Sequence, residues 1–438
     1  MQAIMNKSVK SFKKFLLLWS GQLVSTIGGG LTSFGLAIYV FEQTGKASAT
    51  ALVTLLAFMP SLLLSSYAGV LADRYDRRLL MVLGDGLSAL GLVFILICML
   101  RGDAHLWQIC VGVTISSVFS SLLEPAYKAT VTDLLTEEQY TKASGLVQLA
   151  GAAKFLISPI LAGFLLSVSN IKLLLIIDIC TLFVTVFITF VVRKGLPSKI
   201  SEQVGEKSFI REFKQGWHAV SKNRGVFVLV IMTSVVTFFL GFIETLSIPM
   251  LLAFTDSSVI GTVETVVASG MLVSSMILGF IPIKKDHVKF LSIALFCGGI
   301  FMAGFGFREH ILLICISGFL FFTMLPIANA TLDFLIRTNI NDSVQGRAWS
   351  LIGIISQLGF IVSYALSGII ADFLFTPLLV DGGALANSVG KIIGTGSGRG
   401  IGFLIIIAGV LLSITSVVLY NMKSVRKLEH RGDLCIAE

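Results

Sequence analysis

The sequence predicts an all-α integral membrane protein whose twelve transmembrane helices form two six-helix bundles. Hydrophobic residues make up 55% of the 438-residue chain and charged residues only 13%, about half the charged share of a soluble protein. The mean hydropathy is +0.91, and apolar runs of about 20 residues recur along the chain. Lys and Arg lie mostly between these runs, where a membrane protein carries them.

Twelve apolar runs account for the predicted helices. Such a run spans the bilayer as a helix because it satisfies its own backbone hydrogen bonds there. The runs cover residues 15–41, 48–72, 79–100, 105–127, 143–168, 170–192, 226–254, 258–283, 289–307, 311–335, 347–374 and 400–422. Four lysines precede the first run without a cleavage site, so we interpret it as a span rather than a removed signal peptide.

The charge on the two sides of these runs predicts the topology. With the N-terminus in the cytoplasm, the inner segments carry 26 Lys or Arg and the outer loops carry six. An excess of this kind marks the cytoplasmic side of a membrane protein. A missed span would exchange the two sides and erode the asymmetry, so the charges also support the count of twelve.

The chain divides in the middle into two halves. Residues 193–225 form the longest polar stretch and carry eight Lys or Arg. Within this stretch Phe209, Phe213, Trp217 and Val220 recur at helical spacing, which predicts an amphipathic helix at the membrane surface. We therefore expect a first bundle over 1–192, this linker over 193–225, and a second bundle over 226–438. Six spans on each side suggest pseudo-repeated bundles around a central pathway.

Several classes of function are disfavoured by the composition. The net charge of +8 is explained by orientation in the membrane, so we expect no nucleic-acid partner. The six cysteines show no Cys-x-x-Cys spacing, and we expect no metal site and no cofactor. The five histidines lie in loops or tails, which argues against an intramembrane enzyme. A single chain of two halves fits alternating access better than it fits a channel.

One connection between apolar runs carries a family motif. The segment Gly69-x-Leu71-Ala72-Asp73-Arg74-x-Asp76-Arg77-Arg78 follows the second run and resembles the signature loop of the major facilitator superfamily. That family usually has Gly where this chain has Asp76, and the branch with Asp there resembles macrolide-efflux exporters. Gly346-Arg347 and the Gly-rich stretch 394–400 match the same branch. The resemblance covers essentially the whole chain and implies the major facilitator fold.

A second family pattern, the antiporter signature of the fifth span, is only partly present. Lys154 and Ser158 replace two of its glycines, whereas Pro159, Ala162 and Gly163 keep a kink and small residues. The intramembrane Arg of the family's fourth span is also missing from residues 105–123. These departures weaken the inference of proton exchange from this motif.

The signature loop is itself a candidate gate. Asp73 can face the N-terminus of a helix, whose dipole favours an anion, and the arginines can pair with Asp133 or Glu124. Such contacts form when the inner gate closes and break when it opens. Plain positive-inside charge explains the arginines equally well, but it does not explain an acid among them. The gate candidates are Gly69, Asp73, Arg74, Arg77 and Arg78.

Two opposite charges are predicted in the middle of consecutive spans. At about 1.5 Å per residue and a hydrocarbon core of about 30 Å, Lys154 lies about 16 Å and Asp178 about 18 Å from the inner face. An unpaired charge at this depth costs at least a few kcal/mol, so we expect the two residues to pair. The pair is either static or opens for a proton or a ligand.

Other polar and aromatic residues complete the candidates. Asp85 and Glu124 join Lys154 and Asp178 as proton or ion-pair candidates, because a carboxyl group in a low-dielectric surrounding can exchange a proton. Glu244, Glu264 and Asp372 are interpreted as solvated helix-end residues. The substrate-lining candidates are Gln22, Asn329, Phe238, Phe242 and Phe322, although helix packing and lipid contact explain such residues too.

With the resemblance, these observations predict a secondary active transporter rather than an enzyme. It is expected to export amphiphilic, macrolide-like molecules by alternating access, with proton antiport as the energy source because the chain has no ATP-binding loop. The expected partners are a small lipophilic substrate, protons and the lipid bilayer, and we expect a monomer. The expected location is the bacterial plasma membrane, with both termini cytoplasmic. A carrier of the same fold for a siderophore, a lipid or another metabolite is the alternative.

Overall fold

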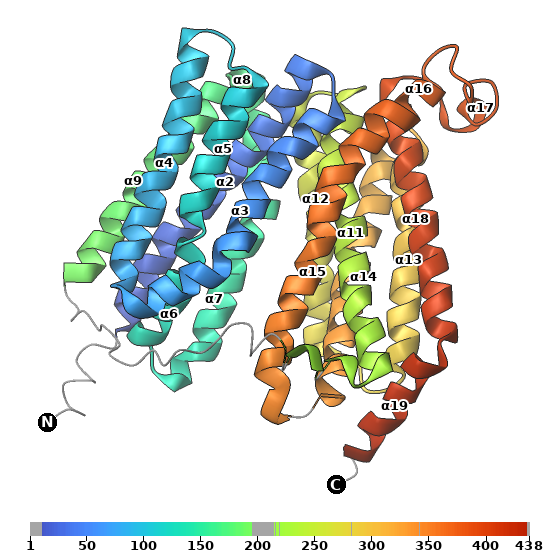
Figure 1. Cartoon of the computed structure of the whole chain (residues 1–438). Coiled ribbons are helices and arrows are strands. Elements are labelled where there is room, and N and C mark those ends of the chain that lie inside the picture. Colours follow the sequence, from blue (N-terminus) through green and yellow to red (C-terminus); the bar gives the residue numbers. More distant parts are fainter. Residues whose placement is uncertain are drawn as a thin grey trace, which may run out of the picture. The chain divides into compact units, whose positions relative to one another are not determined.

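The computed structural model consists of helices and their connections throughout the part of the chain that it describes (Figure 1). It describes residues 11–194, 214, 216–218, 220–281, 283–340 and 342–435. Twelve helical segments in these ranges are long and apolar enough to cross a membrane, which confirms the predicted number of spans. Most of the predicted linker, including Phe209 and Phe213 of its amphipathic helix, lies outside the described residues.

The first six spans contain eight helices, because two spans are interrupted. The helices are α2 (Phe12–Thr44), α3 (Ala47–Arg74), α4 (Arg77–Arg101), α5 (Leu106–Ser120), α6 (Leu123–Leu134), α7 (Glu137–Leu156), α8 (Ser158–Val168) and α9 (Ile171–Lys194). The fourth span consists of α5 and α6, and the fifth of α7 and α8. The break between α7 and α8 falls just before Pro159, which occupies the first turn of α8, where its missing N–H costs nothing.

The last six spans follow the same plan with longer continuous helices. Their helices are α11 (Arg224–Leu252), α12 (Ser257–Phe280), α13 (His287–Phe307), α14 (Ile311–Thr338), α15 (Asp342–Ile370), the π-helix η1 (Ala371–Phe375), α16 (Thr376–Leu379) and α18 (Ser397–Asn421). The short helix α17 (Gly390–Ile393) lies in the connection before α18, and α19 (Lys423–Cys435) follows the last span. The eleventh span combines α15, η1 and α16.

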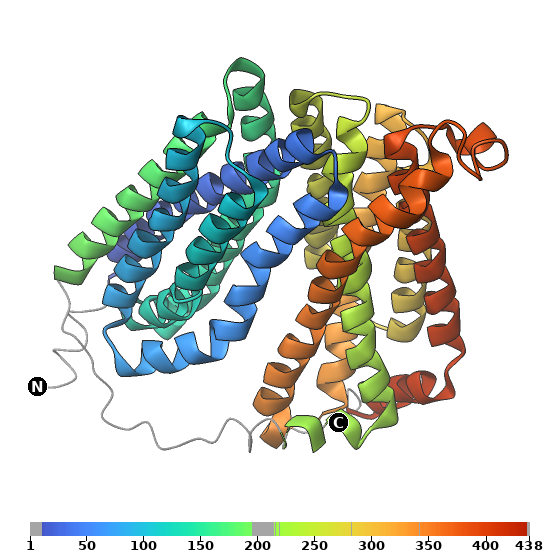
Figure 2. The same cartoon turned by 45° about the horizontal axis from the view of Figure 1, so that its top comes forward.

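The described helices group into two compact units. The first holds α2, α3 from Leu52 onward, α4 to α9, and Ser257–Thr262 at the start of α12; the second holds Lys46–Ala51 and the remaining helices. In the first unit α2 packs against α9, α7 and α8, and α4 packs against α5 and α9 (Figures 1 and 2). In the second unit α13 packs against α18 and α14, and α11 packs against α15.

Glycines allow close helix contacts in each unit. In the first unit Gly91 of α4 faces the carbonyl oxygen of Gly112 of α5, and a side chain at either position would collide with the other helix. In the second unit Gly306 of α13 faces Gly402 of α18 in the same way. The absence of side chains lets the two backbones approach, as small residues do at membrane helix interfaces.

Arg399 fixes the second of these contacts. The side chain is 1% exposed, and its Nη2 donates to the carbonyl oxygens of Gly306 at 2.7 Å and Phe307 at 3.0 Å. These carbonyls lie at the C-terminal end of α13, where the helix dipole favours a cation. The Gly-rich stretch at 394–400 therefore ends in the first turn of α18 and anchors that turn on α13.

We expect Gly91→Ala to destabilise the first unit by about 1–3 kcal/mol, because its methyl group would overpack a backbone contact. Gly86→Ala on the same helix is the matched control, since a Cβ there would meet only Val186 Cγ2, at 4.0 Å. The better helix propensity of Ala should leave this control unchanged or more stable. The melting temperatures of both variants are measured in detergent, with size-exclusion chromatography to monitor unfolding. Equal melting temperatures would contradict the packing argument.

Candidate functional site

Arg77 ties the start of α4 to α6 inside the first unit. Its Nη1 lies 3.0 Å from Asp133 Oδ2, and both side chains are half-buried. The same guanidinium donates from Nε to the carbonyl oxygen of Ala72 at 3.2 Å and from Nη1 to that of Ala129 at 3.3 Å. One side chain thus connects the end of α3, the start of α4 and the middle of α6.

Asp76 forms a second connection, which sequence reasoning missed. It is the N-cap of α4, and its Oδ1 accepts a hydrogen bond from the backbone N–H of Arg78 at 3.1 Å. Its Oδ2 lies 2.9 Å from Nε of Arg193 near the end of α9. The residue that departs from the family pattern therefore carries an ion pair of its own. An acid directly before a helix was the available signal for the cap, but Arg193 is too distant in sequence to be recognised as its partner.

The other predicted gate residues differ from one another in burial. Arg78 is buried at 5% exposure, whereas Arg74 is exposed and Gly69 has open space where a Cβ would lie. The side chain of Asp73 lies outside the described part of the structure. Glu124, a predicted proton candidate and possible arginine partner, is instead exposed and paired with Lys128 one turn later at 2.6 Å. The proton-exchange role of Glu124 stays a prediction.

Replacing Arg77 by glutamine is expected to destabilise the first unit by about 1–2 kcal/mol, because a half-buried ion pair and two carbonyl hydrogen bonds are lost together. Arg74→Gln removes the same charge from an exposed side chain of the same loop and serves as the control. Melting temperatures in detergent measure the difference. If the two variants melt together, the Arg77 contacts contribute no stability.

Two carboxyl groups are buried together within the spans of the first unit. Asp85 of α4 is 2% exposed and Asp178 of α9 is 3% exposed, and they are close enough to interact electrostatically. Thr181 Oγ1 lies 3.5 Å from Asp178 Oδ1. In the described residues Asp85 Oδ2 has no hydrogen-bond partner. Gly28 of α2 makes room for this cluster, since a Cβ there would lie 2.9 Å from Asp178 Oδ1.

Lys154 lies near this cluster, but the predicted direct pair with Asp178 is not present. It acts electrostatically on Asp178, although the described residues contain no ion pair between the two. The Lys154 side chain packs over Gly30, just beyond Gly28 on α2, and the residue is exposed. The depth estimate thus put both residues in the correct neighbourhood.

The second unit contains a carboxyl cluster that the sequence analysis misread. Tyr364 of α15 donates its hydroxyl hydrogen to Glu244 Oε2 of α11 at 2.5 Å. Glu264 of α12 interacts with Glu244 and with the Ser247 hydroxyl, and its Oε1 is buried. The interpretation of Glu244 and Glu264 as solvated helix-end residues was wrong. Both lie about two turns inside their helices, and both are half-buried.

Asp372 is likewise not a freely solvated residue. Its Oδ1 accepts from the backbone N–H of Ala47 at 3.0 Å and its Oδ2 from that of Ser48 at 2.8 Å, all within the second unit. These N–H groups open α3, whose own residues cannot satisfy them. Asp372 therefore acts as the cap of a helix more than three hundred positions away in sequence.

The predicted lining residues show both buried and exposed positions. Phe238 and Phe242 of α11 pack together with ring centroids 4.9 Å apart, and Phe322 of α14 packs on Phe321 at 5.4 Å. Asn329 is exposed. Gln22 of α2, in the first unit, has a buried Oε1 without a hydrogen-bond partner in the described residues. None of these observations identifies a substrate, so the substrate-lining role of the five residues stays a prediction.

Twelve apolar spans with carboxyl groups buried inside them define a multi-pass membrane protein built like a secondary transporter. The sequence profile of the Major Facilitator Superfamily matches residues 18–364, and the chain belongs to that family. The predicted resemblance is therefore confirmed. The described residues contain no group of three or more His, Cys, Asp or Glu that could hold a metal ion.

Comparison with known proteins shows which transporters the chain is similar to. The chain is 27% identical over 372 residues to Macrolide efflux protein A of Streptococcus pyogenes, covering 82% of this chain and 89% of that protein. It is 26% identical over 354 residues to the Staphyloferrin A transporter of Staphylococcus aureus, covering 78% and 83%. The crystal structure of the nucleoside transporter NupG superposes with a TM-score of 0.73 at 12% identity, over 94% of this chain and all of that one, which shows the shared fold.

Proposed function

We propose that this protein exports amphiphilic, macrolide-like molecules from a bacterium by alternating access, in exchange for protons. The substrate class is supported by the similarity to a macrolide efflux protein over most of both chains. The proposed partners are a lipophilic substrate, protons and the lipid bilayer, and the proposed working form is a monomer in the plasma membrane. The excess of Lys and Arg in one set of connections supports cytoplasmic termini.

The buried pair of Asp85 and Asp178 carries the proposal for proton coupling. Two carboxyl groups that interact in a low-dielectric surrounding favour a state in which they share one proton. Lys154 lies near enough to stabilise the remaining negative charge. An exposed lysine in the middle of a span faces water or protein rather than lipid, so it offers protons a route to the pair. Binding and release of this proton would favour different conformations of the carrier.

The function is tested by expressing the protein in a bacterial strain that lacks its own drug exporters. We expect resistance to macrolides to rise without a change in resistance to hydrophilic aminoglycosides, and cellular macrolide accumulation to fall. A protonophore should abolish both effects within minutes. Export that persists after the proton gradient has collapsed would refute the coupling, and unchanged macrolide susceptibility would refute the substrate class.

A carrier for a siderophore is the second candidate, because the Staphyloferrin A transporter is nearly as similar in identity and coverage. Inside-out membrane vesicles distinguish the two candidates. Under the first proposal, vesicles energised with a proton gradient accumulate labelled erythromycin, and excess staphyloferrin A does not compete. Competition or accumulation of staphyloferrin A would favour the second candidate.

A further inference from the structure

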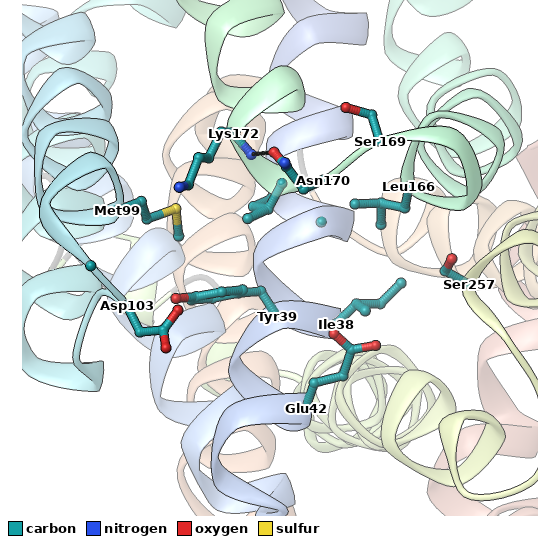
Figure 3. Close-up of a pocket in the computed structure, with 13 residues that line it drawn as sticks. Ile38, Tyr39, Glu42, Met99, Asp103, Leu166, Ser169, Asn170, Lys172 and Ser257 are labelled. Carbon is teal, nitrogen blue, oxygen red and sulfur yellow. Dashed lines mark hydrogen bonds between the residues drawn. The ribbon is translucent and has the colours of Figure 1, made fainter.

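A cavity of about 360 Å³ opens within the first unit, away from the buried Asp85–Asp178 pair (Figure 3). It lies where α2 and α4 end and α9 begins, which is the end that the charge pattern assigns to the outside of the cell. Its size falls at the lower end of the range of small-molecule sites, about 300–1,000 Å³.

The wall of this cavity combines an apolar base with a fixed aromatic ring. Ile38 and Met99 are buried and supply apolar surface. The hydroxyl oxygen of Tyr39 accepts hydrogen bonds from Gln43 Nε2 at 2.7 Å and from the backbone N–H of Ala104 at 3.1 Å. These two bonds hold the phenol ring in place between the end of α2 and the connection after α4. The ring is thus preorganised rather than free to rotate away from a ligand.

Three charged side chains line the same cavity. Glu42 and Asp103 are exposed, and Figure 3 shows them on either side of Tyr39, with Lys172 on the Met99 side of the cavity. In the described part of the chain, none of the three charged groups forms an ion pair. The cavity therefore has two carboxylates to one ammonium, with no internal pair that a ligand would have to break.

We propose that this cavity binds an organic monocation, namely an amphiphilic amine that also carries an acceptor oxygen. The two carboxylates of Glu42 and Asp103 attract the ammonium group of the ligand, which lies on the face of Tyr39, so charge attraction adds to cation–π attraction. The apolar part lies on Ile38 and Met99. Lys172 donates to the acceptor oxygen, which selects against simple alkylamines. This site goes beyond the proposed export function, because it lies within one unit and needs no transport cycle.

Procaine and benzocaine form a matched pair of probes for this site. Both are 4-aminobenzoate esters with an acceptor carbonyl, but only procaine carries a tertiary ammonium group. We expect purified full-length protein in lipid nanodiscs to bind procaine more tightly than benzocaine, measured by saturation-transfer NMR with empty nanodiscs subtracted. Equal binding of the two probes, or no binding of procaine, would overturn the proposal.

Variants locate the binding and test each group. Glu42→Gln and Asp103→Asn should each weaken procaine binding about fivefold and the double variant more than about tenfold, since each removes one of the two negative charges that attract the cation. Lys172→Met should weaken it about threefold through loss of one hydrogen bond. Benzocaine binding should not respond to the two acid substitutions.

Asp381→Asn is the matched control, because it removes an exposed acid that does not line the cavity. Tyr39→Leu gives an independent test, since it removes the ring and keeps every charge. Binding that survives both Tyr39→Leu and the double acid variant would overturn the site. The site would also be overturned if Asp381→Asn lost as much procaine binding as the double acid variant. If procaine instead binds in a transport pathway elsewhere, macrolides will compete with procaine, and the cavity variants will leave the affinity for procaine unchanged. That result would also overturn the proposed site.

Discussion

Asp178→Asn is expected to abolish proton-driven transport while the protein still folds and reaches the membrane. Asparagine has nearly the shape of aspartate, so the packing against Gly28 and the acceptor for Thr181 are retained. What is lost is a group that can bind and release a proton next to Asp85. We expect macrolide uptake into inside-out vesicles to fall more than about tenfold, equivalent to at least about 1.4 kcal/mol in the rate-limiting barrier.

The control for this variant is Glu124→Gln, which neutralises an exposed acid of the same unit in a one-turn ion pair. Such a pair contributes about 0.3–0.5 kcal/mol, so uptake should stay at the wild-type level. The double variant Lys154→Met/Asp178→Asn separates a structural role from a functional one. If it transports normally, Asp178 serves only to balance the lysine, and proton coupling must be sought elsewhere.

Tyr364→Phe is expected to destabilise the second unit by about 2 kcal/mol, because it removes a hydrogen bond to a carboxyl group inside the span. The hydroxyl of Tyr364 lies 2.5 Å from Glu244, which also interacts with Glu264. Without this donor, the mutual repulsion of the two glutamates is less compensated. Glu264→Gln should act in the opposite direction and raise the melting temperature, since it removes one of the two like charges.

These changes are measured as melting temperatures in detergent, with Tyr420→Phe as control. Tyr420 is exposed at the end of α18, and the control deletes the same hydroxyl from the same unit. If Glu264→Gln stabilises the protein yet slows macrolide uptake, the cluster of Glu244, Glu264 and Tyr364 has a role in transport. A lower melting temperature for Glu264→Gln would contradict the repulsion between the glutamates.

The sequence predicted the membrane fold well because hydropathy is a local property. Each span needs only its own residues to be apolar, so twelve runs gave twelve spans in the described residues. Even the interruptions carried local signals, as Pro159 at the start of α8 illustrates. The signature loop from Gly69 to Arg78 identified the family for the same reason, since its residues are consecutive.

The site was harder to predict because its contacts join distant parts of the chain. Asp76 and Arg193 are separated by 117 positions, and no periodicity relates them. Glu264 was misread because depth was judged along one helix, whereas burial depends on the helices packed around it. Lys154 and Asp178 were correctly predicted to lie near each other, but rise per residue does not specify which way a side chain turns around its helix.

The glycine contacts between α13 and α18 restrict how related sequences can diverge. Gly299 faces Gly409 and Gly306 faces Gly402, so both helices place their paired glycines seven residues apart. Deleting one residue of α13 or α18 between the two glycine pairs would turn the rest of that helix by about 100° and bring a side chain into the helix contact. Homologues should therefore conserve the length of both segments. Insertions and deletions should accumulate in the outer connection around 380–396, where loops tolerate them.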